Sequence, residues 1–218
     1  MDSNKIYNLI FGLIGVVLLV IAFNAYQISK LKINKNEVSG NSAAINEPAT
    51  NLPAANLMAP VAGLDVIPKG VPNIYGKEIG VSFDDVSASN QQKADATIRK
   101  LGLLDTQISL KGEELQRYIA VASQISCEYC CGTDSIISPD GKPACGCQHS
   151  FAMRGLAKYI IKNHGKEYTN DEILEELGKW KTLFFPGEIT KKARILQQKG
   201  IELNYINLAS NNYRNIKN

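Results

Sequence analysis

An uncharged apolar stretch near the N-terminus constrains the fold of this 218-residue chain more than any other feature. It runs from Ile6 to Ile28 (IYNLIFGLIGVVLLVIAFNAYQI) and is long enough to cross a bilayer as a helix. Tyr7 and Tyr26 lie about 28 Å apart along such a helix, which suits the two interfaces of a hydrocarbon core about 30 Å thick. We therefore predict an uncleaved transmembrane anchor. A buried core helix is a weaker alternative, and a cleaved signal peptide would have a shorter apolar region.

The remainder of the chain divides into a linker, a folding domain and a tail. Residues 36–80 are rich in Ala, Pro and Asn and have too little hydrophobic periodicity to build a core, so we predict a flexible stalk. Residues 81–208 carry helical patterns almost throughout, and residues 209–218 are expected to be frayed. The predicted fold class is mainly α, in which a membrane anchor in residues 1–35 and a stalk precede a C-terminal helical domain with a short cysteine-bearing ribbon.

Two features of the flanking sequence favour opposite orientations in the membrane. Lys30, Lys32 and Lys35 follow the anchor whereas only Lys5 precedes it, which favours a cytoplasmic C-terminal part. A long stalk that lifts a domain off a membrane is more typical of the outer face. We expect the domain to be extracytoplasmic.

Apolar residues recur at intervals of three and four in five segments of the domain. Trp180 and Phe184 lie on such a stripe, so we expect them in the core and not in a binding site. The expected helices cover residues 90–101, 112–126, 151–165, 169–185 and 188–199. Their ends are indicated by a closing Gly102, an N-capping Ser150, a capping box of Thr169 with Glu172, and a terminating Pro186.

All five cysteines and one of the two histidines lie in the single segment 127–149 (CEYCCGTDSIISPDGKPACGCQH). Packing alone would scatter buried thiols through the core, so this clustering needs a chemical reason. The sequence SPDG at residues 138–141 is typical of a type I turn, which would fold the chain back on itself. The two cysteine groups should then converge at the base of a small ribbon and form one site.

The spacing of these residues favours a metal site. Cys127 and Cys130 stand one turn apart, and the glycines after Cys131 and Cys145 allow the backbone to bend around the sulfurs. Alternate residues of an extended segment share a face, so the second group can also point at one ion. Our first-choice ligands are Cys127, Cys130, Cys145 and Cys147, with Cys131 and His149 as spare or exchange ligands.

So many soft ligands suit Zn²⁺ or Cu⁺, and an iron–sulfur cluster or a dinuclear site is less favoured. Two disulfides with one free thiol are an alternative, although a helical core of over 100 residues needs little stapling. A redox enzyme is a further alternative. Its nucleophile would be Cys147, just before a helix N-terminus, with Cys145 as its partner.

The run ACGCQH and the helix after it resemble bacterial membrane-associated proteins named for a Pro-Cys-Tyr-Cys-Gly-Cys motif. Cys145, Gly146 and Cys147 match the end of that motif, and Pro143 stands where its first cysteine would be. The resemblance implies a surface-tethered, cysteine-rich helical domain.

The expected function is the binding or transfer of a soft transition metal next to a membrane, with a protein partner for transfer and no bond-breaking chemistry. A structural or interaction module, held by disulfides or a closed zinc site, is the alternative. The net charge of +3 comes from interspersed lysines and acids without a basic stripe, so nucleic acid is not an expected partner.

Overall fold

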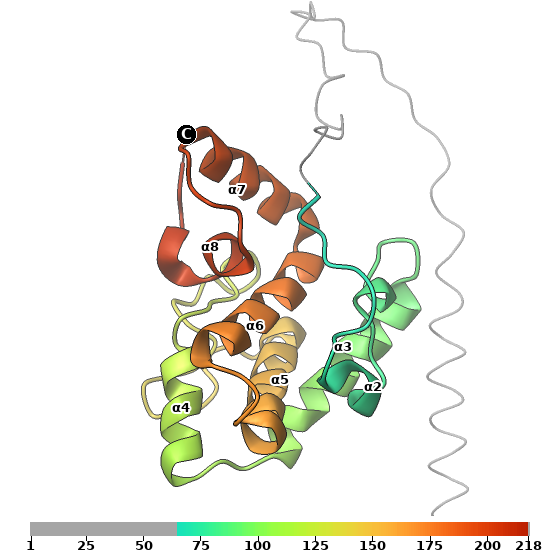
Figure 1. Ribbon diagram of the computed structural model, residues 1–218, viewed down its shortest axis with the longest axis vertical. Coiled ribbons are helices and arrows are strands. Elements are labelled where there is room, and N and C mark those ends of the chain that lie inside the picture. Colours follow the sequence, from blue (N-terminus) through green and yellow to red (C-terminus); the bar gives the residue numbers. More distant parts are fainter. Residues whose placement is uncertain (1–64, 218) are drawn as a thin grey trace, which may run out of the picture. The chain divides into compact units, whose positions relative to one another are not determined.

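The computed structural model describes residues 65–217, and in this part of the chain the protein is a helical bundle (Figure 1). The predicted mainly α class is confirmed for these residues, which contain no β-strand and only two isolated bridges. The predicted span 6–28 and most of the predicted stalk lie outside the described residues. None of the helices from residue 65 to residue 217 combines the length and apolar character needed to cross a membrane.

The helix α5 lies at the centre of the bundle and contacts α3, α4 and α6, while α6 also contacts α7 and α8 (Figure 1). The elements in chain order are α2 (Tyr75–Ile79), η1 (Phe83–Asp85), α3 (Gln91–Gln107), α4 (Gly112–Ala122), α5 (Gln148–His164), α6 (Asn170–Phe184), α7 (Pro186–Gln198), α8 (Tyr205–Ala209) and η2 (Asn211–Tyr213).

The predicted capping box at the start of α6 is confirmed. The Glu172 amide donates to the Thr169 hydroxyl oxygen at 3.2 Å, and the Thr169 amide donates to the Glu172 carboxylate at 2.6 Å. Trp180 is fully buried, as expected of a core residue. Pro186 ends the preceding helix but also begins α7, because a proline at the first helical position has no amide that needs a partner.

Three predicted helix ends are wrong. The helix expected over residues 112–126 ends at Ala122, so Cys127 does not directly follow a helix. Gly102 does not close its helix, which continues to Gln107. The missing side chain of Gly102 instead lets Phe151 pack closely, since an added Cβ would lie 3.3 Å from the Phe151 Cβ. Ser150 does not cap the next helix. The N-cap is Cys147, whose sulfur accepts a hydrogen bond from the Ser150 amide at 3.4 Å.

The closest approach of α3 to α5 occurs at Gly155. A Cβ added to this glycine would clash with the Leu101 carbonyl oxygen and would lie 2.9 Å from the Asp105 amide nitrogen. These are backbone atoms of the facing helix, so they can move only if the two helices separate. The glycine therefore sets the spacing of the largest helix–helix contact in the core.

We expect Gly155→Ala to lower the free energy of unfolding by about 2–3 kcal/mol, because overpacking outweighs the gain of about 1 kcal/mol in helix propensity. Denaturant unfolding followed by the fluorescence of the single tryptophan would measure this change. The matched control is Gly187→Ala in α7, where an added Cβ meets no atom within 4 Å and stability should be unchanged or higher. Equal effects of the two substitutions would contradict the close approach.

The folded part of the chain begins earlier than the predicted boundary at residue 81. Tyr75 of α2 is fully buried, and its hydroxyl accepts from the Trp180 indole at 2.8 Å and donates to the Glu176 carboxylate at 2.6 Å. Val66 is also buried, against α7 and α8. Residues 65–80 have the composition of a linker. They nevertheless pack on the domain, because the side chains of Val66 and Tyr75 are buried against its helices.

The described part of the predicted frayed tail, residues 209–217, is also packed. Ala209 and Ser210 are buried, and Ser210 forms a bridge with Ile125 next to the cysteine segment. Arg214 pairs with Asp134 and donates to a carbonyl of the same loop. The C-terminal residues therefore form one wall of the cysteine site.

Candidate metal centre

A short ribbon brings the two cysteine groups together, as the sequence predicts. The Gly141 amide donates to the Ser138 carbonyl at 2.8 Å, which closes the expected turn, and a bridge links Ile137 with Pro143. On the other side, the Ile136 amide donates to the Ile125 carbonyl at 3.0 Å. The first cysteine group is thereby held between the end of α4 and the ribbon.

The first group of cysteines forms a tight turn around the Cys127 carbonyl. This oxygen accepts hydrogen bonds from the amides of Cys130 at 3.1 Å, Cys131 at 3.1 Å and Gly132 at 3.4 Å. Gly132 has φ +66°, a left-handed conformation that glycine adopts without strain. The turn thereby brings the sulfurs of Cys127, Cys130 and Cys131 close together in space.

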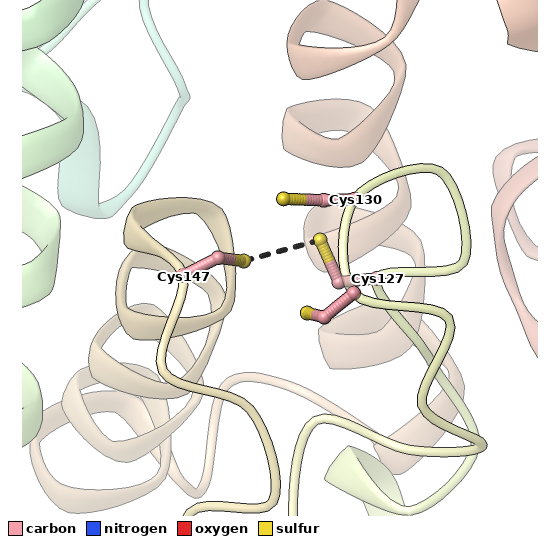
Figure 2. A group of neighbouring side chains, drawn as sticks. Cys127, Cys130 and Cys147 are labelled. Carbon is pink, nitrogen blue, oxygen red and sulfur yellow. Dashed lines mark hydrogen bonds between the residues drawn. The ribbon is translucent and has the colours of Figure 1, made fainter.

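The second group reaches the site through the N-terminus of α5. Figure 2 shows the Cys147 sulfur at the start of this helix facing the Cys127 sulfur of the turn, with Cys130 beside them. The Cys127 and Cys147 sulfurs are 3.3 Å apart. Two segments separated by the ribbon therefore contribute to one group of sulfurs.

Four sulfur atoms, from Cys127, Cys130, Cys131 and Cys147, all lie within 4.8 Å of one another. Ligands of a tetrahedral Zn²⁺ ion are separated by about 3.8 Å, given Zn–S bonds of about 2.3 Å. Small side-chain rotations would bring the three free sulfurs, those of Cys127, Cys130 and Cys147, to that spacing. Cys127 is fully buried, Cys147 is half-buried, and Cys130 and Cys131 are exposed, so the site opens to solvent on one side.

The structure differs from the first-choice ligand set at Cys145. This cysteine forms a disulfide with Cys131 and is not a member of the four-sulfur group, whereas Cys131, which we predicted to be a spare ligand, is. The three remaining cysteines are free. The difference arises because Cys145 is buried in the core, with 5% of its surface exposed, while Cys131 belongs to the turn that carries the other ligands.

His149 lies next to the four-sulfur group but outside it. Its ring packs against Phe184 and Phe185, with centroid separations of 5.0 and 4.8 Å. The Nδ1 atom is buried and has no hydrogen-bond partner of good geometry. The structure therefore does not place His149 among the ligands, and its imidazole acts on the site by helping to lower the pKa of Cys147.

The site holds one thiolate more readily than an ordinary cysteine does. A hydrogen bond from Cys127 is the largest cause that lowers the pKa of Cys147 to about 3, and interactions with His149 and Ser150 add to it against the effect of burial. The same hydrogen bond, with burial, raises the pKa of Cys127 far above its usual value. The Cys127 and Cys147 sulfurs therefore share one proton. A soft cation that binds both sulfurs would displace this proton.

Two buried lysines and the partly buried Arg214 surround Glu128, which lies inside the cysteine turn. Its carboxylate is 3.0 Å from the Lys181 ammonium and 3.8 Å from both the Lys192 ammonium and the Arg214 Nε. Burial lowers the pKa of Lys192 to about 8. Burial also lowers the pKa of Lys181, which is close enough to Cys127 for charge on that sulfur to oppose the effect. Arg214 also pairs with Asp134, so three basic side chains and two carboxylates lie beside the sulfurs. A positive charge on Lys181 favours a thiolate at Cys127.

A buried arginine supports the opposite side of the loop. Arg154 of α5 is fully buried, pairs with Asp105 of α3 at 2.8 Å, and donates to the carbonyls of Ile136 at 3.1 Å and Cys145 at 2.9 Å. It thus joins two core helices to both arms of the ribbon. Sequence reasoning did not identify Arg154 or the Glu128 cluster; the detectable signal was a charged residue on an otherwise apolar helical face.

No protein-family model, curated protein or solved structure matches this chain. The resemblance to the Pro-Cys-Tyr-Cys-Gly-Cys proteins therefore stays a prediction, and the functional argument depends on the geometry of the site.

Proposed function

We propose that this protein binds a soft transition metal ion, Zn²⁺ or Cu⁺, through thiolates of the cysteine turn and of the α5 N-terminus, and hands it on to a partner. The single observation that carries the proposal is the four-sulfur group, whose members Cys127, Cys130, Cys131 and Cys147 lie within 4.8 Å of one another. Thiolate ligands select Cu⁺ and Zn²⁺ over hard cations such as Mg²⁺ and Ca²⁺. Sulfurs that hold an iron–sulfur cluster bind different iron atoms, so a group this compact suits one ion better.

Exposure of the site supports transfer over a structural role. A structural zinc site is closed, with four protein ligands around the ion. Here Cys130 and Cys131 are exposed, so a partner's thiol can reach the metal. Most of the core is supplied by side chains of the helices, and the cysteine segment adds only a few residues such as Cys127 and Cys145, so the fold has less need of a metal staple than a smaller domain.

We propose further that the anchor predicted at residues 6–28 keeps this exchange next to a membrane, with the domain on the extracytoplasmic side. The anchor's length and lack of charge support the tether, and the long stretch between it and residue 65 supports a domain held away from the bilayer.

Elemental analysis of the full-length chain tests the proposal. Purified under a phosphine reductant without added metal, the chain should contain about one equivalent of zinc or copper. The matched control is Met153→Leu, which removes a soft but fully buried thioether of α5 and should leave the metal content unchanged. A metal-free reduced protein that also fails to bind added Zn²⁺ or Cu⁺ would refute metal binding.

A thiol–disulfide oxidoreductase is the second candidate, because Cys147 is a thiolate at a helix N-terminus and has a second sulfur 3.3 Å away. The pair in the structure is Cys147 with Cys127, and not with Cys145 as the sequence suggested. Catalytic turnover of a disulfide substrate by metal-free protein would favour this candidate over metal binding.

A further inference from the structure

One sulfur atom takes part in two mutually exclusive arrangements. The Cys131 sulfur is bonded to Cys145, and it also lies within 4.8 Å of the sulfurs of Cys127, Cys130 and Cys147. A disulfide sulfur carries no negative charge and is a poor ligand compared with a thiolate. The site therefore offers three thiols while the disulfide is closed and four once it is open.

We propose that the Cys131–Cys145 disulfide is a redox switch of the metal site: while it is closed, three thiolates hold the ion weakly, and once it is reduced, Cys131 completes a four-thiolate site that holds the ion tightly. This inference depends on the proposed metal binding and adds its regulation.

The burial of the two sulfurs determines how the disulfide is opened. Cys131 is exposed whereas Cys145 is 5% exposed, so an external dithiol attacks the Cys131 sulfur. The attack forms a mixed disulfide with Cys131 and releases the Cys145 thiolate. The second thiol of the reductant then displaces the Cys131 thiolate and leaves as an oxidised disulfide, so two electrons pass from the dithiol to the protein.

The backbone explains why the released Cys131 becomes the ligand. Its amide donates to the Cys127 carbonyl at 3.1 Å, so Cys131 stays in the same turn as the other ligands. The Cys145 carbonyl is instead bound by the buried Arg154, which keeps this residue against the core. After reduction, the Cys131 sulfur therefore remains in the metal site and the Cys145 sulfur stays outside it.

Metal binding and disulfide reduction are then reciprocally linked. An ion that prefers the reduced form stabilises it, so the ion makes the disulfide easier to reduce. A hundredfold preference raises the reduction potential of the Cys131–Cys145 couple by about 59 mV, since each tenfold change corresponds to about 30 mV for two electrons. In the reverse direction, a disulfide oxidant takes two electrons from the Cys131 and Cys145 thiols and leaves as its dithiol, and closing the Cys131–Cys145 bond consequently promotes release of the metal.

Zinc affinity of the full-length chain in its two redox states tests this switch. Competition against a chromophoric chelator should give at least hundredfold tighter Zn²⁺ binding after reduction with a phosphine, with the disulfide state read from the mass of the intact chain. Cys145→Ser should bind Zn²⁺ tightly with or without reductant, because Cys131 has lost its disulfide partner and stays free to bind the ion. The matched variant Cys131→Ser should bind weakly in both conditions.

Equal affinity of oxidised and reduced wild-type protein would overturn the switch while leaving metal binding intact, and this comparison needs no variant to fold. Tight binding by Cys131→Ser together with weak binding by Cys145→Ser would overturn it by making Cys145 the fourth ligand. Absence of Zn²⁺ binding in the reduced wild-type chain would instead refute the proposed function, and the switch with it.

Discussion

Replacing Arg154 by Ala should lower the free energy of unfolding by about 3–5 kcal/mol, because the substitution removes one partner of a buried ion pair. The Arg154 side chain is 0% exposed and that of Asp105 is 3% exposed, so the abandoned carboxylate cannot be solvated without local opening. Lys158 remains 2.7 Å from Asp105 and offsets part of this cost. The carbonyls of Ile136 and Cys145 also lose a donor.

Urea unfolding followed by Trp180 fluorescence would measure the change. Arg99→Ala is the matched control, because Arg99 is an exposed arginine of α3 and its replacement should alter stability by no more than about 0.5 kcal/mol. If Arg154→Ala does not fold, Arg154→Lys keeps the charge, loses part of the hydrogen bonding and should give a smaller destabilisation. Equal stability of the Arg154 and Arg99 variants would show that the buried pair contributes nothing.

Local patterns predicted most of the helices because their signals act over a few residues. The Thr169 and Glu172 capping box and the stripe through Trp180 are examples. Helix ends that depend on distant residues were not predictable in the same way. Gly102 was expected to stop a helix, yet it serves a contact with Phe151, some fifty residues away.

The packed ends of the domain show a second limit. Residues 65–80 have the composition of a linker, and only Tyr75 among them makes a large buried contact with α6. One aromatic ring does not create a periodic pattern, so no sequence signal distinguished this segment from the stalk. The residues after 208 are held by Ser210, which bridges to Ile125 just before the cysteine segment, and by Arg214, which donates to the Gly132 carbonyl within it.

The location of the site was predictable, but its bonding was not. The turn at residues 138–141 required the two cysteine groups to converge, and they do. Which sulfur pairs with which depends on side-chain burial, and the sequence does not reveal that Cys145 faces the core while Cys131 faces the turn. Lys181 was in principle detectable, because it lies four residues after Leu177 on the buried face of α6.

Replacing Cys127 by Ser should weaken metal binding of the reduced protein at least hundredfold. Structural zinc sites bind with about 10–16 kcal/mol, so each of four thiolates contributes on the order of 3 kcal/mol. Bound metal stabilises the fold by mass action, which gives about 4.1 kcal/mol at a thousand times the dissociation constant and about 1.4 kcal/mol at ten times. At a fixed zinc concentration in this range, the variant should therefore lose about 2.7 kcal/mol of metal-dependent stability.

Cys130→Ser is the matched control, because Cys130 belongs to the same ligand group but is exposed whereas Cys127 is fully buried. Both variants should lose metal affinity to a similar extent. In metal-free protein only Cys127→Ser should destabilise the fold, by about 1–3 kcal/mol, since its hydroxyl replaces a sulfur packed in the core and hydrogen bonded to Cys147. Titration with Zn²⁺ combined with unfolding measurements separates the two effects. A Cys127 variant that binds zinc as tightly as the wild-type chain would exclude this sulfur from the site, whatever its effect on the metal-free fold.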